Sequence, residues 1–425
     1  MHKLGFTVFL LFFTVFCEAQ LPTLAKESDS VAKDSIIKLD YLSSLLNGYF
    51  PTNYFDFDIK YLLKYNQYEA IRLGLGGTTN NHFSKKLRLG GYVAYAFKDH
   101  NFKFSVNGSV RVNEKKNTWL KAAYTSDLQE TASTAFVVDG RVFQLFEPRL
   151  LNIDLFYHHQ TTSIGLQNDL SPHLLSEIQL ANSFIEPTYN YGYILNNHIY
   201  STYHISTAIV CLQWSPFSIF ERTTGRPRET VVGYPKFTFQ ATKSFSDVLG
   251  GDFNFIKFDF RTFFKFVHNN KTNTEFILTS GIALGDTPLT HLYHAYPNNI
   301  TKETILQRFT VAGLNSFETM YFNEFFSDKF LTLQGRHYFK PFYESKWSKP
   351  QLAIVSRFAL GNMKNKARHL GLSFDTLEKG YFESGIELNK LLFGFGLSFS
   401  YRYGSYHLSH EADNMALKFT FNITL

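Results

Sequence analysis

The 425-residue sequence predicts an all-β fold, an antiparallel transmembrane β-barrel of about sixteen strands with a short N-terminal helix or extended segment. Three observations lead to this prediction. Apolar and polar residues alternate with a period of two over stretches of about ten residues, long enough to cross a bilayer as tilted strands. The 46 Phe and 25 Tyr favour a pleated surface that is covered on one side. The first residues have the character of an export signal, and no later apolar run is long enough for a transmembrane helix.

The N-terminus is interpreted as a signal peptide, residues 1–19. Lys3 precedes the apolar residues 4–16, and Cys17-Glu18-Ala19 provides a small-x-small cleavage site. Cleavage would leave Cys211 as the single cysteine. The mature chain is therefore expected to be exported, without an intramolecular disulfide or a cysteine-based metal site.

Residues 20–53 are expected to form a short periplasmic segment. Asp34 could cap a short helix that continues through Leu46. From about residue 54 the period changes to two, so residues 54–425 are assigned to the barrel.

The alternating stretches separate charged from apolar side chains. In residues 254–266, one face carries the candidate lumenal charges Lys257, Asp259, Arg261 and Lys265, and the opposite face carries Ile and Phe. These charges are expected to compensate one another as a ladder in a polar lumen. A soluble β-sandwich also has alternating strands. Stretches longer than the usual five or six residues, unbroken Phe/Leu faces and charges in mid-strand favour the barrel.

The sequence ends on an alternating stretch, residues 415–425. We expect this stretch to be the closing strand, because an open sheet edge is not viable in lipid. Its outward residues are the predicted C-terminal assembly signal: Leu417, Phe419, Phe421, Ile423 and Leu425. Lys418, Thr420 and Asn422 are expected to face the lumen. A charged tag appended after Leu425 should impair assembly.

Two long stretches interrupt the alternation, residues 128–149 and 286–314. If both termini are periplasmic, a count of about sixteen strands places these stretches on the periplasmic side, although long loops normally face outward. A miscount by one strand in each half of the chain would place them outside instead. If residues 286–314 instead fold into the lumen, deleting them should raise conductance.

Several motifs resemble a large family of Gram-negative outer-membrane proteins of unknown function, over roughly residues 45–425. The first matching elements are Asn66, Tyr68-Glu69, Arg72, Leu73-Gly74, Phe83-Ser84, Gly90-Gly91-Tyr92, Tyr95 and Lys98-Asp99. The second, Met-x-x-x-Glu-Phe-x-Ser-Asp, corresponds to Met320, Glu324, Phe325 (or Phe326), Ser327 and Asp328.

In that family the barrel usually follows a carboxypeptidase-regulatory-like domain. The barrel is more distantly similar to the superfamily of outer-membrane insertases and two-partner secretion pores, the bacterial surface antigens. The resemblance implies a pore, secretion or membrane-assembly component. About thirty residues separate the signal peptide from the first matching element, so neither a regulatory-like domain nor periplasmic repeats are expected here.

The remaining function classes leave few candidate residues. The net charge of +6 is dispersed, without the Lys/Arg stripe that nucleic acid requires. His204 and Ser206, or His407 and Ser409 with Asn414 nearby, have the i, i+2 spacing that a lipid-acting barrel enzyme would use. His291 and His294 could bind a metal.

We nevertheless expect no enzyme activity, no metal and no cofactor. The expected partners are outer-membrane lipid, the barrel-assembly machinery during insertion, and an unknown periplasmic or surface protein. Two alternatives stay open: an outer-membrane enzyme that acts on lipid, and a structural surface antigen with a closed barrel.

Overall fold

The structure is a computed structural model that describes residues 45, 48–139, 148–221, 228–268, 271–300, 310–313, 315–345 and 347–421. The expected helix before Leu46, and Ile423 and Leu425 of the predicted assembly signal, lie outside the described residues. The described residues form strands joined by turns and short 3-10 helices. No helix among them has the length and apolar character needed to cross a bilayer.

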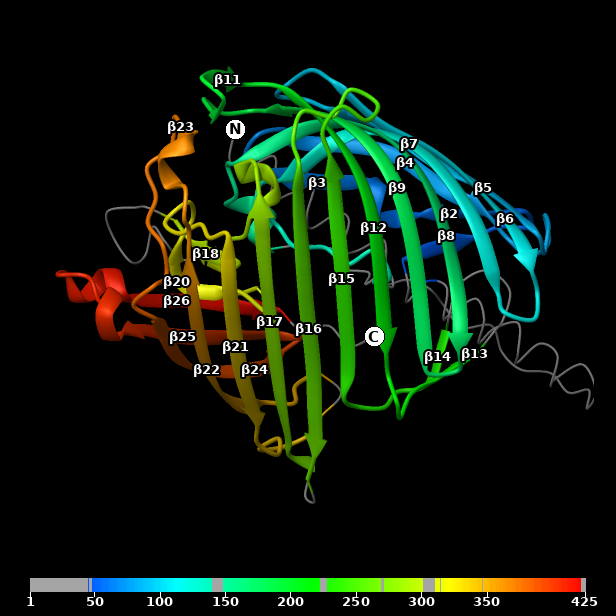
Figure 1. Cartoon of the computed structure of the whole chain (residues 1–425). Coiled ribbons are helices and arrows are strands. Elements are labelled where there is room, and N and C mark those ends of the chain that lie inside the picture. Colours follow the sequence, from blue (N-terminus) through cyan, green and yellow to red (C-terminus); the bar gives the residue numbers. More distant parts are fainter. Residues whose placement is uncertain are drawn as a thin grey trace, which may run out of the picture. The chain divides into compact units, whose positions relative to one another are not determined.

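One large sheet contains nineteen strands among the described residues. Its long strands are β4 (Ala70–Thr79), β5 (Leu87–Ala96), β6 (Phe102–Asn113), β7 (Thr118–Glu130), β8 (Phe156–Ser171), β9 (Leu174–Pro187), β12 (Tyr203–Trp214), β15 (Lys236–Phe245), β16 (Phe255–Val267), β17 (Asn273–Gly285), β21 (Lys329–Tyr338), β22 (Gln351–Asn362), β24 (Tyr381–Leu392), β25 (Phe395–Tyr403) and β26 (Met415–Phe421). Each pairs with the next in an antiparallel register (Figure 1). The predicted all-β, antiparallel fold is confirmed.

Short elements complete the structure. The sheet also contains β1 (Tyr49–Pro51), β2 (Phe55–Asp58), β3 (Leu63–Asn66) and β19 (Thr310–Val311). Smaller sheets are formed by β10 (Gly192–Leu195), β11 (His198–Tyr200) and β23 (His369–Leu370), by β13 (Ile219–Glu221) and β14 (Arg228–Val231), and by β18 (Pro297–Asn299) and β20 (Phe317–Tyr321). The 3-10 helices are η1 (Ile59–Tyr61), η2 (Pro148–Leu151), η4 (Leu289–His291), η5 (Lys366–Arg368), η6 (Gly404–Tyr406) and η7 (Glu411–Asn414).

The two edges of the large sheet carry different short strands. β2 and β3 both pair with β4, and η1 separates them. At the other edge, β19 pairs in parallel with β26. The residue pairings of β26 among the described residues are with β25 and β19, and β1, β2 and β3 pair among themselves or with β4. Barrel closure and the count of sixteen strands therefore remain predictions.

The two faces of the sheet differ in polarity, as β25 shows. Phe395, Leu397 and Phe399 are exposed on one face, whereas Ser398 and Ser400, between them, are buried on the other. A face of exposed apolar side chains is what contact with lipid requires. We call this face outer and the opposite, polar face inner.

The two long connections lie at the other end of the sheet from the one that the sequence-based strand count gave. Because neighbouring strands are antiparallel, successive connections alternate between the two ends. Residues 131–155 and 286–328 follow β7 and β17, which both run away from the end where β26 finishes (Figure 1). A count of about sixteen strands with periplasmic termini places residues 128–149 and 286–314 at the end where β26 finishes, whereas the described parts of these stretches lie at the opposite end. Sequence periodicity does not show where a strand ends and a turn begins. β8, for example, runs unbroken through 16 residues. If one turn is wrongly placed, every later connection is assigned to the wrong end of the sheet.

Candidate functional site

A long connection packs against the inner face of the sheet. The described residues between β17 and β21 (286–300, 310–313 and 315–328), which we call the inner segment, contain η4, β18, β19 and β20. β20 contacts β25 and β26, so the segment lies over the last strands of the sheet (Figure 1). The inward side chains there are accordingly buried, including Arg357, Glu383, Arg402 and Lys418.

Tyr293 attaches the start of the inner segment to β16. Its hydroxyl donates a hydrogen bond of 2.7 Å to Asp259, and Lys257 Nζ lies 4.5 Å from its ring centroid. Its ring also stacks on Phe330, with centroids 4.6 Å apart. A Cβ on Gly281 would lie only 2.6 Å from this ring, so β17 needs glycine there. Two of the four candidate lumenal charges thus hold one tyrosine of the inner segment.

Glu383 of β24 binds the strand β20. Its carboxylate accepts hydrogen bonds from the backbone N–H groups of Glu318, at 3.1 Å, and Thr319, at 2.7 Å. Arg357 of β22 forms an ion pair with the same carboxylate. Both charges are almost fully buried, and a buried carboxylate is tolerated only with such partners.

Lys418 connects the inner segment to β26. This side chain is 0% exposed, pairs with Glu318 at 3.1 Å and donates to the backbone carbonyl of Asn298. β19 lies along the edge of the same strand, where Ala312 N–H donates to the Phe419 carbonyl at 2.7 Å. The inner segment therefore covers both the inner face and the edge of β26.

A second connection, residues 131–155, lies beside the inner segment. Arg261 of β16 forms an ion pair with Asp139, and its guanidinium lies 4.5 Å from the Phe136 ring centroid. Gln240 of β15 accepts from Val137 N–H and donates to the Ala135 carbonyl, each at 3.0 Å.

The last candidate lumenal charge, Lys265, pairs with Glu275 of the adjacent strand at 2.8 Å. Glu275 lies opposite Arg336, and Arg336 bonds to Glu387 at 3.1 Å. This row is a compensated ladder, but with partners on β17, β21 and β24. Lys257 and Asp259 also contact Tyr293, and Arg261 pairs with Asp139, so these three have partners in the two inner connections. That the four charges compensate one another as a ladder stays a prediction.

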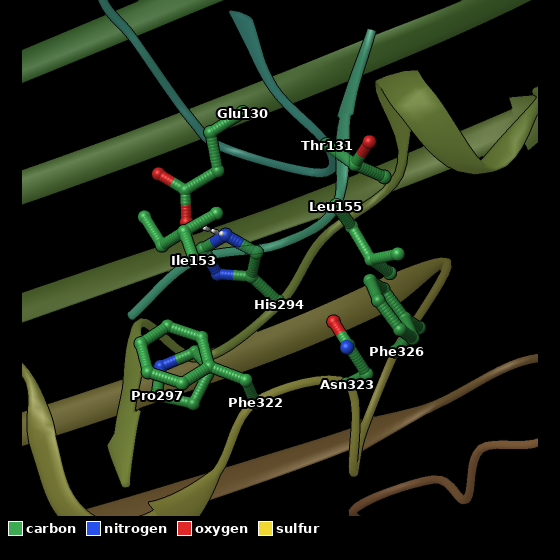
Figure 2. Close-up of a pocket in the computed structure, with 9 residues that line it drawn as sticks. All are labelled: Glu130, Thr131, Ile153, Leu155, His294, Pro297, Phe322, Asn323 and Phe326. Atoms are coloured by element: carbon green, nitrogen blue, oxygen red, sulfur yellow. Dashed lines mark hydrogen bonds and ion pairs between the residues drawn. The ribbon is translucent and has the colours of Figure 1, made fainter. Parts of the chain in front are cut away.

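A small pocket marks the junction of the two connections (Figure 2). It is lined by Glu130, Thr131, Ile153, Leu155, His294, Pro297, Phe322, Asn323 and Phe326. His294 Nε2 lies 2.8 Å from the Glu130 carboxylate, which also binds Arg149. Since every charged group here has a protein partner, we interpret the pocket as a joint between the connections.

Burial sets the ionisation of groups in the inner segment. It lowers the pKa of His291 to about 3, helped by the neighbouring Lys257 and His159. Burial raises the pKa of Glu324, against the opposing effect of Arg402, which bonds to this carboxylate at 2.7 and 3.1 Å.

Strands β7 to β9 leave part of the inner face uncovered. Thr125, Thr161, Ser163 and Ser183 point inward, and all are partly exposed. The same face carries the ion pair of Lys121 with Glu177, at 3.0 Å. The inner face is thus covered over β15 to β26, whereas over β7 to β9 it carries small polar side chains and paired charges.

Glu69, Arg72, Tyr92 and Asp99, four of the residues that carry the family resemblance, meet in one cluster at the edge of this uncovered region. Arg72 forms two hydrogen bonds to Asp127, at 2.6 and 3.0 Å. Tyr92 bonds to the same carboxylate. Lys103 bonds to Asp99 at 2.6 Å and lies 3.8 Å from Glu69. Asp127 and Lys103 were missed by the sequence analysis, although both occupy inward positions of alternating stretches.

The side chains of the candidate enzymatic residues contact other residues of the protein. Ser206 Oγ accepts from Asn182 at 2.8 Å and donates to the Val248 carbonyl at 2.6 Å, and the His204 ring packs near Phe184. Asn414 accepts from Leu408 N–H at 2.7 Å.

His407 lies 3.1 Å from the Tyr401 hydroxyl, outside the strands. Ser409 lies in a bend between η6 and η7.

The two histidines proposed as metal ligands have separate partners. His291 Nδ1 lies 2.9 Å from Thr290 Oγ1, whereas His294 binds Glu130. Within the described ranges, no group of three His, Cys, Asp or Glu side chains is placed to hold a metal ion.

The outward residues of β26 lie where lipid would contact them. Leu417 and Phe419 are exposed, and Phe421 packs on Phe395 with ring centroids 4.7 Å apart. Lys418 and Thr420 are buried on the inner face. The role of these residues as an assembly signal remains a prediction.

Comparisons with known proteins gave matches to structures alone. No protein-family model matches the sequence, and no curated protein matches it. Similar solved structures include BamA from Haemophilus ducreyi lacking POTRA domains 1–3, with 10% identity, a TM-score of 0.47, and coverage of 84% of this chain and 68% of that one. CdiB from Acinetobacter baumannii has 11% identity and a TM-score of 0.45, covering 84% of this chain and 57% of that one. CdiB from Escherichia coli has 9% identity and a TM-score of 0.47, covering 83% and 59%.

Proposed function

We propose that this protein is an outer-membrane β-barrel that serves membrane passage or assembly, as a pore, secretion or insertion component. The inner segment is its plug. The exposed apolar rows of the outer face support membrane embedding. The polar inner face supports a lumen.

One observation carries the plug assignment. The inner segment binds buried groups of β16, β24, β25 and β26 at once, through Tyr293, Thr319, Glu324 and Glu318. Small polar side chains over β7 to β9 stay partly exposed. A segment held along one half of a polar surface can be released without unfolding the strands, because its contacts with β16, β24, β25 and β26 each involve a side chain or belong to one short parallel bridge.

Conductance in planar bilayers tests this proposal. Replacing residues 286–326, which include Tyr293, Glu318, Thr319 and Glu324, with a short Gly-Ser linker should raise the single-channel conductance. The matched control replaces residues 219–231, which form the β13–β14 hairpin at the other end of the sheet, and should leave conductance unchanged. Equal, low conductance in all three proteins would contradict the plug and favour a closed barrel that anchors surface loops.

The lipid-acting enzyme predicts a different result. If the protein is such an enzyme, the purified protein should hydrolyse bilayer phospholipid, and the His204→Ala variant should not. Because Ser206 is held by Asn182 and Val248, we expect no hydrolysis in either protein.

A further inference from the structure

Two connections form a rigid platform at the end of the sheet where β26 finishes. Residues 339–345 and 347–350 lie between β21 and β22, and Phe393-Gly394 joins β24 to β25. Phe393 N–H donates to the Trp347 carbonyl and Lys349 N–H to the Lys390 carbonyl, each at 2.9 Å. The Trp347 and Phe393 rings lie 5.3 Å apart. We call these residues the rim platform.

The rim platform presents exposed aromatic side chains. Phe342 is 66% exposed, Tyr343 and Trp347 are each 56% exposed, and Phe393 is 52% exposed. Phe393, in the turn before β25, precedes Phe395 by two residues, and Phe395 begins the outer row that runs through Leu397 and Phe399. The aromatic group therefore lies at the end of a strand whose outer row is assigned to lipid.

The platform is also basic. Lys271 and Lys349 share Glu344, at 2.9 and 3.4 Å. Lys340 is exposed at the start of the connection, and Lys390 lies in the hydrogen-bonded turn. Four lysines against one glutamate leave a formal charge of +3 among these described residues. Exposed Trp and Tyr beside Lys is the composition of a membrane–water interface, where rings reach the headgroup level and ammonium groups meet phosphate.

We propose that the rim platform is a binding site for the phosphate-bearing headgroup of an anionic phospholipid. Lys349 and Lys390 supply the charge, and Trp347 with Phe393 packs beside the upper acyl chain. The site rests on the membrane embedding in the proposed function, and does not depend on the plug. Lipid is the occupant that fits, because the platform lies at the end of the apolar outer row and adds positive charge there.

Tryptophan fluorescence in proteoliposomes tests the site. Trp119 is buried, whereas Trp214 is 51% exposed near the same end of the sheet. A Trp214→Phe variant reports mainly on Trp347, and Trp347→Phe reports mainly on Trp214. Each is placed in mixed phosphatidylglycerol and phosphatidylcholine vesicles in which one lipid carries brominated acyl chains. Brominated phosphatidylglycerol should quench Trp347 roughly twofold more than equal brominated phosphatidylcholine.

Charge variants separate the site from general attraction. In the Trp214→Phe background, Lys349→Gln with Lys390→Gln should make quenching by the two lipids equal. Lys364→Gln with Lys366→Gln, at the opposite end of the sheet, should preserve the preference.

Three results would overturn the inference. They are equal quenching of Trp347 by both lipids, quenching of Trp214 without quenching of Trp347, and loss of the preference in the control variant. Absence of quenching at both tryptophans would instead contradict membrane embedding and, with it, the proposed function.

Discussion

Single residues hold the inner segment, and the close contact at Gly281 is the most sensitive of them. A Cβ at this position would overlap the Tyr293 ring, which has the neighbouring Phe330 ring on it and Asp259 at its hydroxyl. The ring cannot shift without losing one of these contacts.

Gly281→Ala should therefore loosen the inner segment, at a cost of about 1–3 kcal/mol for an overpacked site. Conductance should rise and the thermal unfolding temperature should fall. Gly108→Ala is the matched control, because its Cβ would meet Leu89 at an ordinary 3.6 Å. Equal behaviour of the two variants would mean that Tyr293 does not hold the plug.

Acid should release the inner segment through His291. In the packed state burial lowers the pKa of this imidazole to about 3, whereas a released segment would have the ordinary value of about 6.5. Between these values protons bind the released state and not the packed one, so the packed state loses stability as pH falls from 6.5, on the order of 4–5 kcal/mol in full.

Conductance measured from pH 7.5 down to 4.5 should therefore increase, and His291→Leu should flatten the profile. His407→Leu, in the connection between β25 and β26, should leave the profile unchanged. A wild-type conductance independent of pH over this range would contradict the role of His291.

At the scale of elements, β26 is coupled to β19 and β20. Lys418 and Glu318 form a buried pair between β26 and β20, and β19 lies on the edge of β26. Removing one member of a buried ion pair leaves an unpaired charge, whereas replacing both can be nearly neutral.

Glu318→Gln alone should destabilise the protein by about 3–5 kcal/mol, because Lys418 is left unpaired. Glu318→Leu with Lys418→Met should recover most of this loss. Denaturant unfolding followed by tryptophan fluorescence gives the coupling free energy. Additive effects of the single substitutions Glu318→Leu and Lys418→Met would show that the pair does not link the two strands.

At the scale of the molecule, the antiparallel order of the strands decides which connections share an end. Residues 246–254 precede β16 and His268 follows it, so they lie at opposite ends of this strand. His268 and Lys271 share their end of the sheet with the finish of β26, which is expected at the periplasmic rim.

Cysteine labelling on intact cells tests this orientation. Val248 and Lys271 are both well exposed, and the buried Cys211 gives little background. A membrane-impermeant maleimide should label Val248→Cys on intact cells, and Lys271→Cys only after the outer membrane is broken. The reverse pattern would invert the orientation.

The sequence by itself determined the strand class, the two faces and the outward positions of β26, because a strand places alternate residues on opposite faces whatever its neighbours are. It also identified Lys257, Asp259, Arg261 and Lys265 as one inward row. Only the tertiary structure decided the partners of that row and the ends at which the long connections lie. Tyr293 and Asp139 come from connections without periodicity, and their contacts with β16 join residues 34 and 122 positions apart. Such contacts cannot be predicted from a local sequence pattern, because they depend on how the folded sheet places its inner face against the connections.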